Sequence, residues 1–256
     1  MAPRIDSWLT DEVARRRTKA ALVWSIVLTA GLYLLPFGGL VGYPLVLLST
    51  LVHEVGHGIA ALLVGGSFER FVMFPDASGM ATSSGVGAGW PRAVVCAGGL
   101  VGPAIAAGLA FVVARRPVWS RMFLVMLAAT LVALALTVVR NGFGLAFVGI
   151  LAVLFALAGV RASAATAQVV TVFMAVQLAL SVFSRGDYLF VQEAHTGAGT
   201  APSDVAHMAS ALGGPYWLWG LCCGGFSVLV LVVGVWAFWR ALSRGKIEYR
   251  GPAKRR

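Results

Sequence analysis

The segment His53-Glu54-Val55-Gly56-His57 contains two histidines four residues apart, with a glutamate directly after the first. On an α-helix, residues at this spacing lie about 40° apart around the axis and about 6 Å apart along it, so both imidazoles can reach one metal ion. Glu54 lies on the flank of the same face, where its carboxylate can contact a water molecule on the metal. This is the HExxH arrangement of zinc peptidases, in which the metal acidifies the water and the glutamate takes its proton. The sequence therefore predicts a Zn²⁺ site with His53 and His57 as ligands and Glu54 as the catalytic base.

A second interpretation of the same residues needs no metal. Histidines inside a membrane protein can form interhelical hydrogen bonds or relay protons, and the chain would then be an ion or proton transporter. The four-residue spacing favours the metal site, because a relay has no need of it.

The composition indicates the environment of this segment. Hydrophobic residues make up 59% of the 256 positions and charged residues only 12%, which is typical of integral membrane proteins. The basic residues gather at the two ends of the chain, which suits anionic lipid headgroups better than nucleic acid. The excess of arginine over lysine, with abundant alanine, valine and glycine, is typical of bacteria with GC-rich genomes. We therefore expect a multi-pass protein of a bacterial plasma membrane, with lipid and no nucleic acid as its partners.

Seven apolar runs approach the length of about 20 residues that a helix needs to cross a bilayer. The predicted fold is an all-α polytopic membrane protein with six or seven transmembrane helices, forming one domain over 20–240 between basic tails at 1–19 and 241–256. With seven spans the tails would lie on opposite sides, and the positive-inside rule does not decide the orientation. Almost no loop separates the two runs around Arg140-Asn141, so one of them is the best candidate for a re-entrant segment. The runs are 20–40, 43–65, 93–114, 119–139, 142–160, 163–183 and 215–239.

Two connections between these runs are unusual. In residues 67–85, two short β-rich stretches flank a Pro-Asp-Ala-Ser-Gly turn, which predicts a membrane-associated β-hairpin directly after the HExxH helix; an ordinary polar loop is the alternative. In residues 184–214, Pro202-Ser203-Asp204 predicts a short helix with Ser203 as its N-cap. We expect His195 and His207, in the same connection, to be solvated.

These features resemble the site-2 protease family of intramembrane zinc metallopeptidases, in particular its small bacterial branch. The matching pieces are HEVGH in an early membrane helix, FVMFPDASGMAT in the place of the family's membrane-embedded hairpin, and CAGGLVGPAIAAG with Gly102-Pro103. The resemblance covers residues 43–110, and HExxH is its specific part.

The resemblance implies a third zinc ligand, an aspartate on a later membrane helix. The family's Asp-Gly and Asn-Pro contexts are missing here, and two aspartates lie at a useful distance. Asp187, at the end of an apolar run, is the preferred candidate, with pairing to Arg185 as its alternative role. Asp204 is the second candidate, although a carboxylate in the first turn of a helix is also favoured by the helix dipole. Asn141 is expected to cap a helix end, with polarisation of a substrate carbonyl as the alternative.

The expected function is therefore hydrolysis of peptide bonds in membrane-spanning protein substrates. An exposed strand of the hairpin would hold an unwound substrate segment by β-augmentation, and Glu54 would act as base and then as proton donor to the leaving amine. Because the family's aspartate context is missing, an inactive zinc-binding family member is a further alternative.

Overall fold

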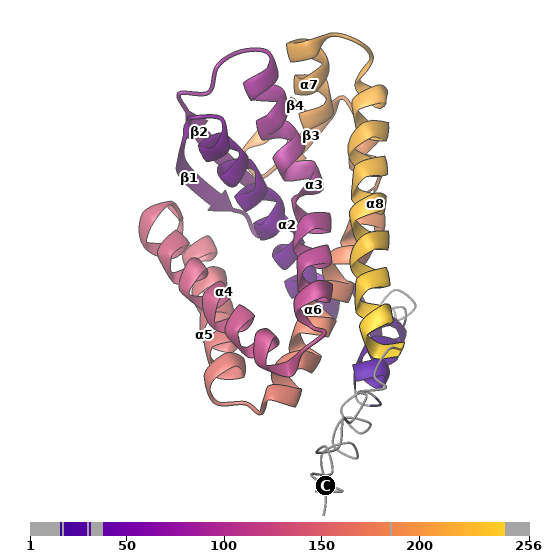
Figure 1. The fold of residues 1–256 in the computed structure, drawn as a ribbon. Coiled ribbons are helices and arrows are strands. Elements are labelled where there is room, and N and C mark those ends of the chain that lie inside the picture. The colour runs from indigo at the N-terminus through magenta and orange to yellow at the C-terminus, as the bar shows by residue number, and fades with distance from the viewer. Residues whose placement is uncertain (1–15, 17, 30, 32–37, 185, 244–256) are drawn as a thin grey trace, which may run out of the picture.

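Six long apolar helices dominate the computed structural model, which describes residues 16, 18–29, 31, 38–184 and 186–243 (Figure 1). Each of the six is long and apolar enough to cross a membrane, which confirms the predicted polytopic helical fold. The first predicted run, 20–40, contributes a shorter helix at Thr18–Thr29 to the described part of the chain. The long helices are α2 (Gly38–Leu63), α3 (Trp90–Val113), α4 (Pro117–Thr137), α5 (Gly142–Val160), α6 (Ala164–Ser184) and α8 (Tyr216–Ser243).

The helices form an inner and an outer group. In α2, α3 and α6 half or slightly more of the apolar window is buried, against 22–28% in α4, α5 and α8. The large apolar side chains exposed on the outer helices have the character expected of a surface in contact with lipid. The HExxH segment lies on α2, so its polar groups belong to the part of the bundle that is shielded best.

Glycines allow α2 and α3 to pack closely. A Cβ added to Gly56 would collide with the backbone of Gly98, and one added to Gly98 would lie 2.6 Å from the Gly56 carbonyl oxygen. Small residues at facing positions let two membrane helices approach backbone to backbone. Helix α3 can therefore reach the histidines of α2 with its own backbone.

The predicted hairpin is present, with β1 (Ser67–Met73) antiparallel to β2 (Gly79–Ser84). Its turn is stabilised by Asp76, whose Oδ1 accepts a hydrogen bond from the Ser78 backbone N–H at 2.9 Å. The hairpin lies against α2, since the Thr50 hydroxyl donates to the Ala77 carbonyl at 2.7 Å.

The connection between α4 and α5 covers the outer edge of β1. The Phe71 N–H donates to the Val138 carbonyl at 2.8 Å, and the Arg140 N–H donates to the Phe71 carbonyl at 3.0 Å. The Asn141 side chain continues this pairing, because its amide donates to the Met73 carbonyl at 2.7 Å and its oxygen accepts from the Met73 N–H at 3.3 Å. Asn141 is the N-cap residue of α5, at a helix end as predicted, but its side chain makes no capping hydrogen bond and pairs with Met73 instead.

The connection between α6 and α8 contains more structure than the sequence predicted. A 3₁₀ helix, η1 (Gly186–Phe190), is followed by a second hairpin of β3 (Glu193–Thr196) and β4 (Gly199–Pro202), and then by α7 (Asp204–Leu212). The predicted N-cap is confirmed, since Ser203 Oγ accepts from the Ala206 N–H at 3.3 Å. The two hairpins touch at their turns, where the Gly197 N–H donates to Ser78 Oγ at 2.9 Å.

Candidate metal centre

Helix α2 brings the two predicted histidines together. Their Nε2 atoms lie 3.1 Å apart, and the rings meet edge to face with centroids 4.7 Å apart. This arrangement follows from the spacing in the sequence, because residues i and i+4 share one face of a helix.

The third member of the cluster is Asp204, the first residue of α7. Its Oδ2 atom lies 3.3 Å from His53 Nε2 and 3.4 Å from His57 Nε2. Two features hold the carboxylate there. The Ser203 hydroxyl donates to the Val191 carbonyl at 2.6 Å, and Val205 and Met208 of α7 are buried in a cluster with Cys96 of α3.

The three atoms fit the donor set of a divalent metal ion. A tetrahedral zinc ion with bonds of about 2.0–2.1 Å has ligand atoms about 3.3 Å apart. The separations of 3.1, 3.3 and 3.4 Å here agree with that geometry. Asp204 Oδ2 is also buried without a hydrogen-bond partner, an arrangement that costs free energy unless a cation binds there. The residues present therefore suit a metal ion.

The backbone of α3 orients His57 for this role. His57 Nδ1 lies 2.8 Å from the Val95 carbonyl, and only the protonated Nδ1 can donate to that oxygen. In the neutral ring the lone pair then lies on Nε2, the atom that faces Asp204, where it is placed to bind a metal ion. Gly99 leaves room for the ring, since a Cβ at this position would overlap the imidazole.

Burial and charge act in opposite directions on Asp204. Burial would raise the pKa of this carboxyl, but the neighbouring imidazoles of His57 and His53 hold it well below its ordinary value. The lowered pKa favours the ionised carboxylate, the form of an aspartate that zinc coordination requires.

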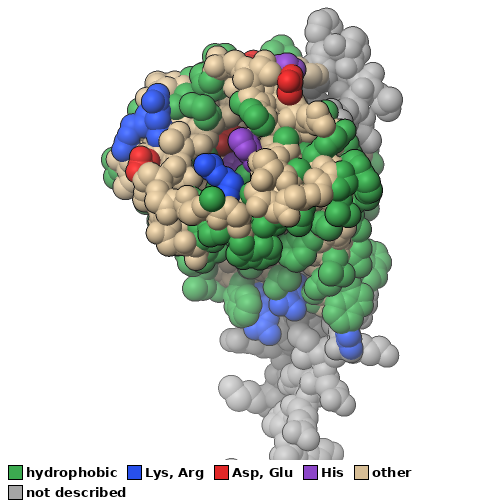
Figure 2. Space-filling view, turned by 90° about the horizontal axis from the view of Figure 1, so that it is seen from above, with side chains coloured by type: hydrophobic (Ala, Val, Ile, Leu, Met, Phe, Trp, Pro, Cys, Tyr) green, Lys and Arg blue, Asp and Glu red, His purple; other side chains and the backbone are tan. Residues whose placement is uncertain are grey.

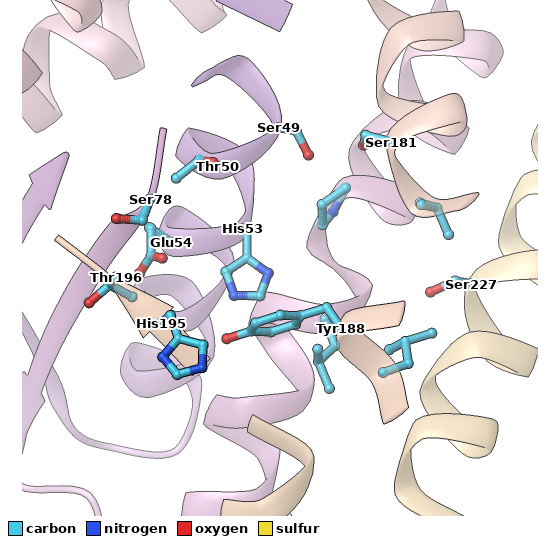
Figure 3. A pocket seen from close by; sticks show the side chains of 15 residues that line it. Ser49, Thr50, His53, Glu54, Ser78, Ser181, Tyr188, His195, Thr196 and Ser227 are labelled. Carbon is cyan, nitrogen blue, oxygen red and sulfur yellow. The ribbon is translucent and has the colours of Figure 1, made fainter. Parts of the chain in front are cut away.

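A cavity of about 100 Å³ opens beside the cluster (Figure 3). Glu54 lies between His53 and the start of β2, where it packs so closely on Gly79 that a Cβ there would lie 2.7 Å from Glu54 Cγ. Tyr188 of η1 and His195 of β3 lie across the cavity from Glu54, with the tyrosine hydroxyl directed toward the histidine. His195 Nδ1 is 2.9 Å from Thr200 Oγ1 of the paired strand β4.

Comparison with protein families agrees with this geometry. The sequence profile of the family described as Peptidase M50B-like matches residues 20–234. The chain belongs to the Peptidase M50B-like family. No curated protein and no solved structure gives a significant match. The match confirms the predicted resemblance to site-2 proteases and extends it over most of the chain.

In this M50B-like protein, the two candidates for the third ligand differ in one respect: the structure describes the side chain of Asp204 but not that of Asp187. Asp204, the second candidate, belongs to the only group of three potential ligand side chains found among the described residues. Asp187 lies in η1, but its side chain is outside the described part of the chain, as is all of Arg185. The ligand role predicted for Asp187 therefore stays a prediction.

Sequence reasoning missed the residues on the far wall of the cavity. His195 is exposed, as expected for a solvated residue, but it also lines the cavity together with Thr196 and Tyr188. A signal was present, because a Gly-containing turn, Gly197 to Gly199, separates the two short stretches that form β3 and β4.

Proposed function

We propose that this M50B-like protein is an intramembrane zinc endopeptidase that cleaves membrane-spanning proteins. The observation that carries the proposal is the convergence of three ligand atoms within 3.4 Å of one another beside Glu54. The family match supports it independently. A transporter would have no need for three atoms at the spacing of a tetrahedral metal site.

His53, His57 and Asp204 would hold the ion, with Asp204 in place of the preferred sequence candidate Asp187. A bound Zn²⁺ would lower the pKa of a water molecule and polarise the scissile carbonyl. Glu54 would take the proton of that water and pass it to the leaving amine. His195 and Tyr188, on the opposite wall, would donate hydrogen bonds to the carbonyl oxygen as it gains negative charge. Asn141 is not suited to this role, because both ends of its amide are bound to Met73.

The hairpin supports binding of an extended substrate along β2. The other edge, on β1, is taken by residues 138–141. Phe71 directs its N–H and C=O to those residues, so its partner Ala81 must direct its own N–H and C=O away from β1. Met73 likewise directs its N–H and C=O to Asn141, so its partner Gly79 also directs its own N–H and C=O away from β1. Gly79 is a neighbour of Glu54. A substrate strand paired with β2 would therefore run toward the catalytic base.

Removal of the metal tests the proposal directly. Purified protein is expected to contain about one zinc per chain, and treatment with 1,10-phenanthroline should abolish cleavage of a single-span reporter that carries Gly-Pro in its membrane segment. Added Zn²⁺ should restore cleavage, and circular dichroism should show that the helices persist without the ion. Metal-free protein that still cleaves the reporter would refute the proposal. Bound zinc without cleavage would indicate an inactive family member. Ion flux in proteoliposomes would indicate a transporter.

The open edge of β2 gives a second test. Ala81→Pro removes one outward N–H without removing a bond to β1, while Ala81→Ser keeps that N–H. Loss of one hydrogen bond to the substrate, about 0.5–1.5 kcal/mol, should lower kcat/KM by about two- to tenfold in the proline variant only. Zinc content should be the same in both variants. Equal kcat/KM values for the two would exclude substrate pairing at this edge.

A further inference from the structure

The two ends of the helix bundle differ in structure. At one end, here called the site end, lie both hairpins, α7 and the cavity (Figure 1). At the other, here called the basic end, lie the α3–α4 and α5–α6 connections and the end of α8. The N-terminal helix begins at the basic end, since the Lys19 ammonium lies 5.8 Å from the ring centre of Trp239 in α8. Figure 2, seen from above, shows a surface made mostly of backbone and of side chains that are neither hydrophobic nor charged, with a histidine side chain visible in its hollow and apolar side chains along the flank.

Charge also divides between the two ends. Among the described residues, the basic end has seven lysines or arginines and no aspartate or glutamate. The site end has three described arginines, Arg70, Arg92 and Arg140, and all six of the described acidic residues: Glu54, Glu69, Asp76, Asp187, Glu193 and Asp204. The seven basic residues are Arg16, Lys19, Arg115, Arg116, Arg121, Arg161 and Arg240.

The basic side chains lie where headgroups of a bilayer would meet the bundle. Arg116 and Arg240 each stack over a tryptophan, at 5.4 and 4.8 Å from the ring centres of Trp119 and Trp236. Tryptophan and arginine in contact at the ends of apolar helices are typical of the membrane interface. The connections at this end are only about three residues long, and short connections are those to which the positive-inside rule applies.

The number of spans bears on the orientation, which the positive-inside rule does not decide for seven spans. Among the described residues there are six candidate spans, starting with α2 and ending with α8, and this even number places the start of the first and the end of the last on the same side. Only one end of the bundle then carries an excess of described basic residues, so the positive-inside rule favours a single orientation.

We infer that the basic end faces the cytoplasm and that the metal site opens toward the opposite, non-cytoplasmic side of the membrane. Resting on the proposed function, the inference also names a substrate class. The substrates are membrane-anchored proteins whose unwound segment lies at the non-cytoplasmic end of their span, because only that end can reach β2 and Glu54 without crossing the bilayer.

Cysteine labelling tests the orientation without any need for activity. Ala198→Cys lies in the exposed turn of the second hairpin, and Ala162→Cys lies in the α5–α6 connection. A membrane-impermeant maleimide added to intact cells should label Ala198→Cys, and it should label Ala162→Cys only after permeabilisation. The unsubstituted protein gives the background, since its three cysteines lie within membrane helices. Labelling of Ala162→Cys in intact cells, alone or together with Ala198→Cys, would overturn the inference.

A pair of reporters tests the substrate class. Two single-span proteins carry the same Gly-Pro segment, one at the cytoplasmic end of the span and one at the non-cytoplasmic end. Cleavage of the second only is expected, and cleavage of the first only would overturn the substrate class. If neither is cleaved while the labelling pattern holds, the proposed peptidase activity fails and the orientation stands. Adding Glu54→Gln to the Ala198→Cys and Ala162→Cys variants should leave their labelling unchanged while cleavage is lost, which separates the two results.

Discussion

The variant Glu54→Gln is expected to keep its bound zinc while cleavage of a single-span reporter falls by ~10²–10⁴-fold, the usual contribution of a general base. Glutamine has the shape of glutamate and keeps the close packing of this side chain on Gly79. It cannot take a proton from water, so the loss should appear in kcat. Zinc is measured by plasma mass spectrometry on the same sample used for cleavage.

A matched variant separates chemistry from folding. Glu69→Gln makes the same change at an exposed residue of β1 and should cleave at the wild-type rate. If Glu54→Gln cleaves as fast as Glu69→Gln, Glu54 is not the base and the peptidase assignment falls. If Glu54→Gln instead loses its zinc, the loss of the metal explains the loss of cleavage. Glu54 would then be needed to hold the metal, and its role as the base would not be supported.

The part of the site predicted from the sequence is the part encoded by local geometry. His53, Glu54 and His57 lie within five residues of one apolar helix, so helical spacing alone determines which side chains share a face. The first hairpin was predictable for the same reason, because its turn residues and both strands lie within 18 consecutive positions of Ser67–Ser84. The N-cap at Ser203 likewise depends on adjacent residues only.

The proposed third ligand, Asp204, is a different kind of problem, because it lies 147 positions after His57 in the sequence. Its location depends on how α7 packs on α3, and this follows from a buried cluster of residues in three separate helices. In the sequence, Asp204 has the features of an ordinary carboxylate in the first turn of a helix, and no neighbouring residue marks it as a metal ligand. The segment that covers the outer edge of β1 was not predictable for the same reason. The role of the Arg140-Asn141 connection depends on backbone hydrogen bonds with Phe71, which is distant in the sequence.

The choice between the two aspartates leads to the second large effect. Asp204→Asn is expected to lower zinc affinity by more than ~100-fold, because loss of a partner one shell further out already costs about 10–100-fold. Asparagine is a neutral and weaker ligand of nearly the same shape. Helix α7 should still form, since its N-cap hydroxyl belongs to Ser203. Affinity is measured by competition with a chelator of known strength.

Asp187→Asn is the matched control, because it makes the same substitution at the aspartate that the sequence favoured. With Asp204 as the ligand, this variant should bind zinc as tightly as wild type. The reverse pattern, zinc lost from Asp187→Asn and kept by Asp204→Asn, would return the ligand role to Asp187. The Asp187 carboxylate, and not that of Asp204, would then be the one that binds the ion together with the two imidazoles. Loss of zinc from both variants would mean that two carboxylates share the ion, and the three-atom site described here would be incomplete.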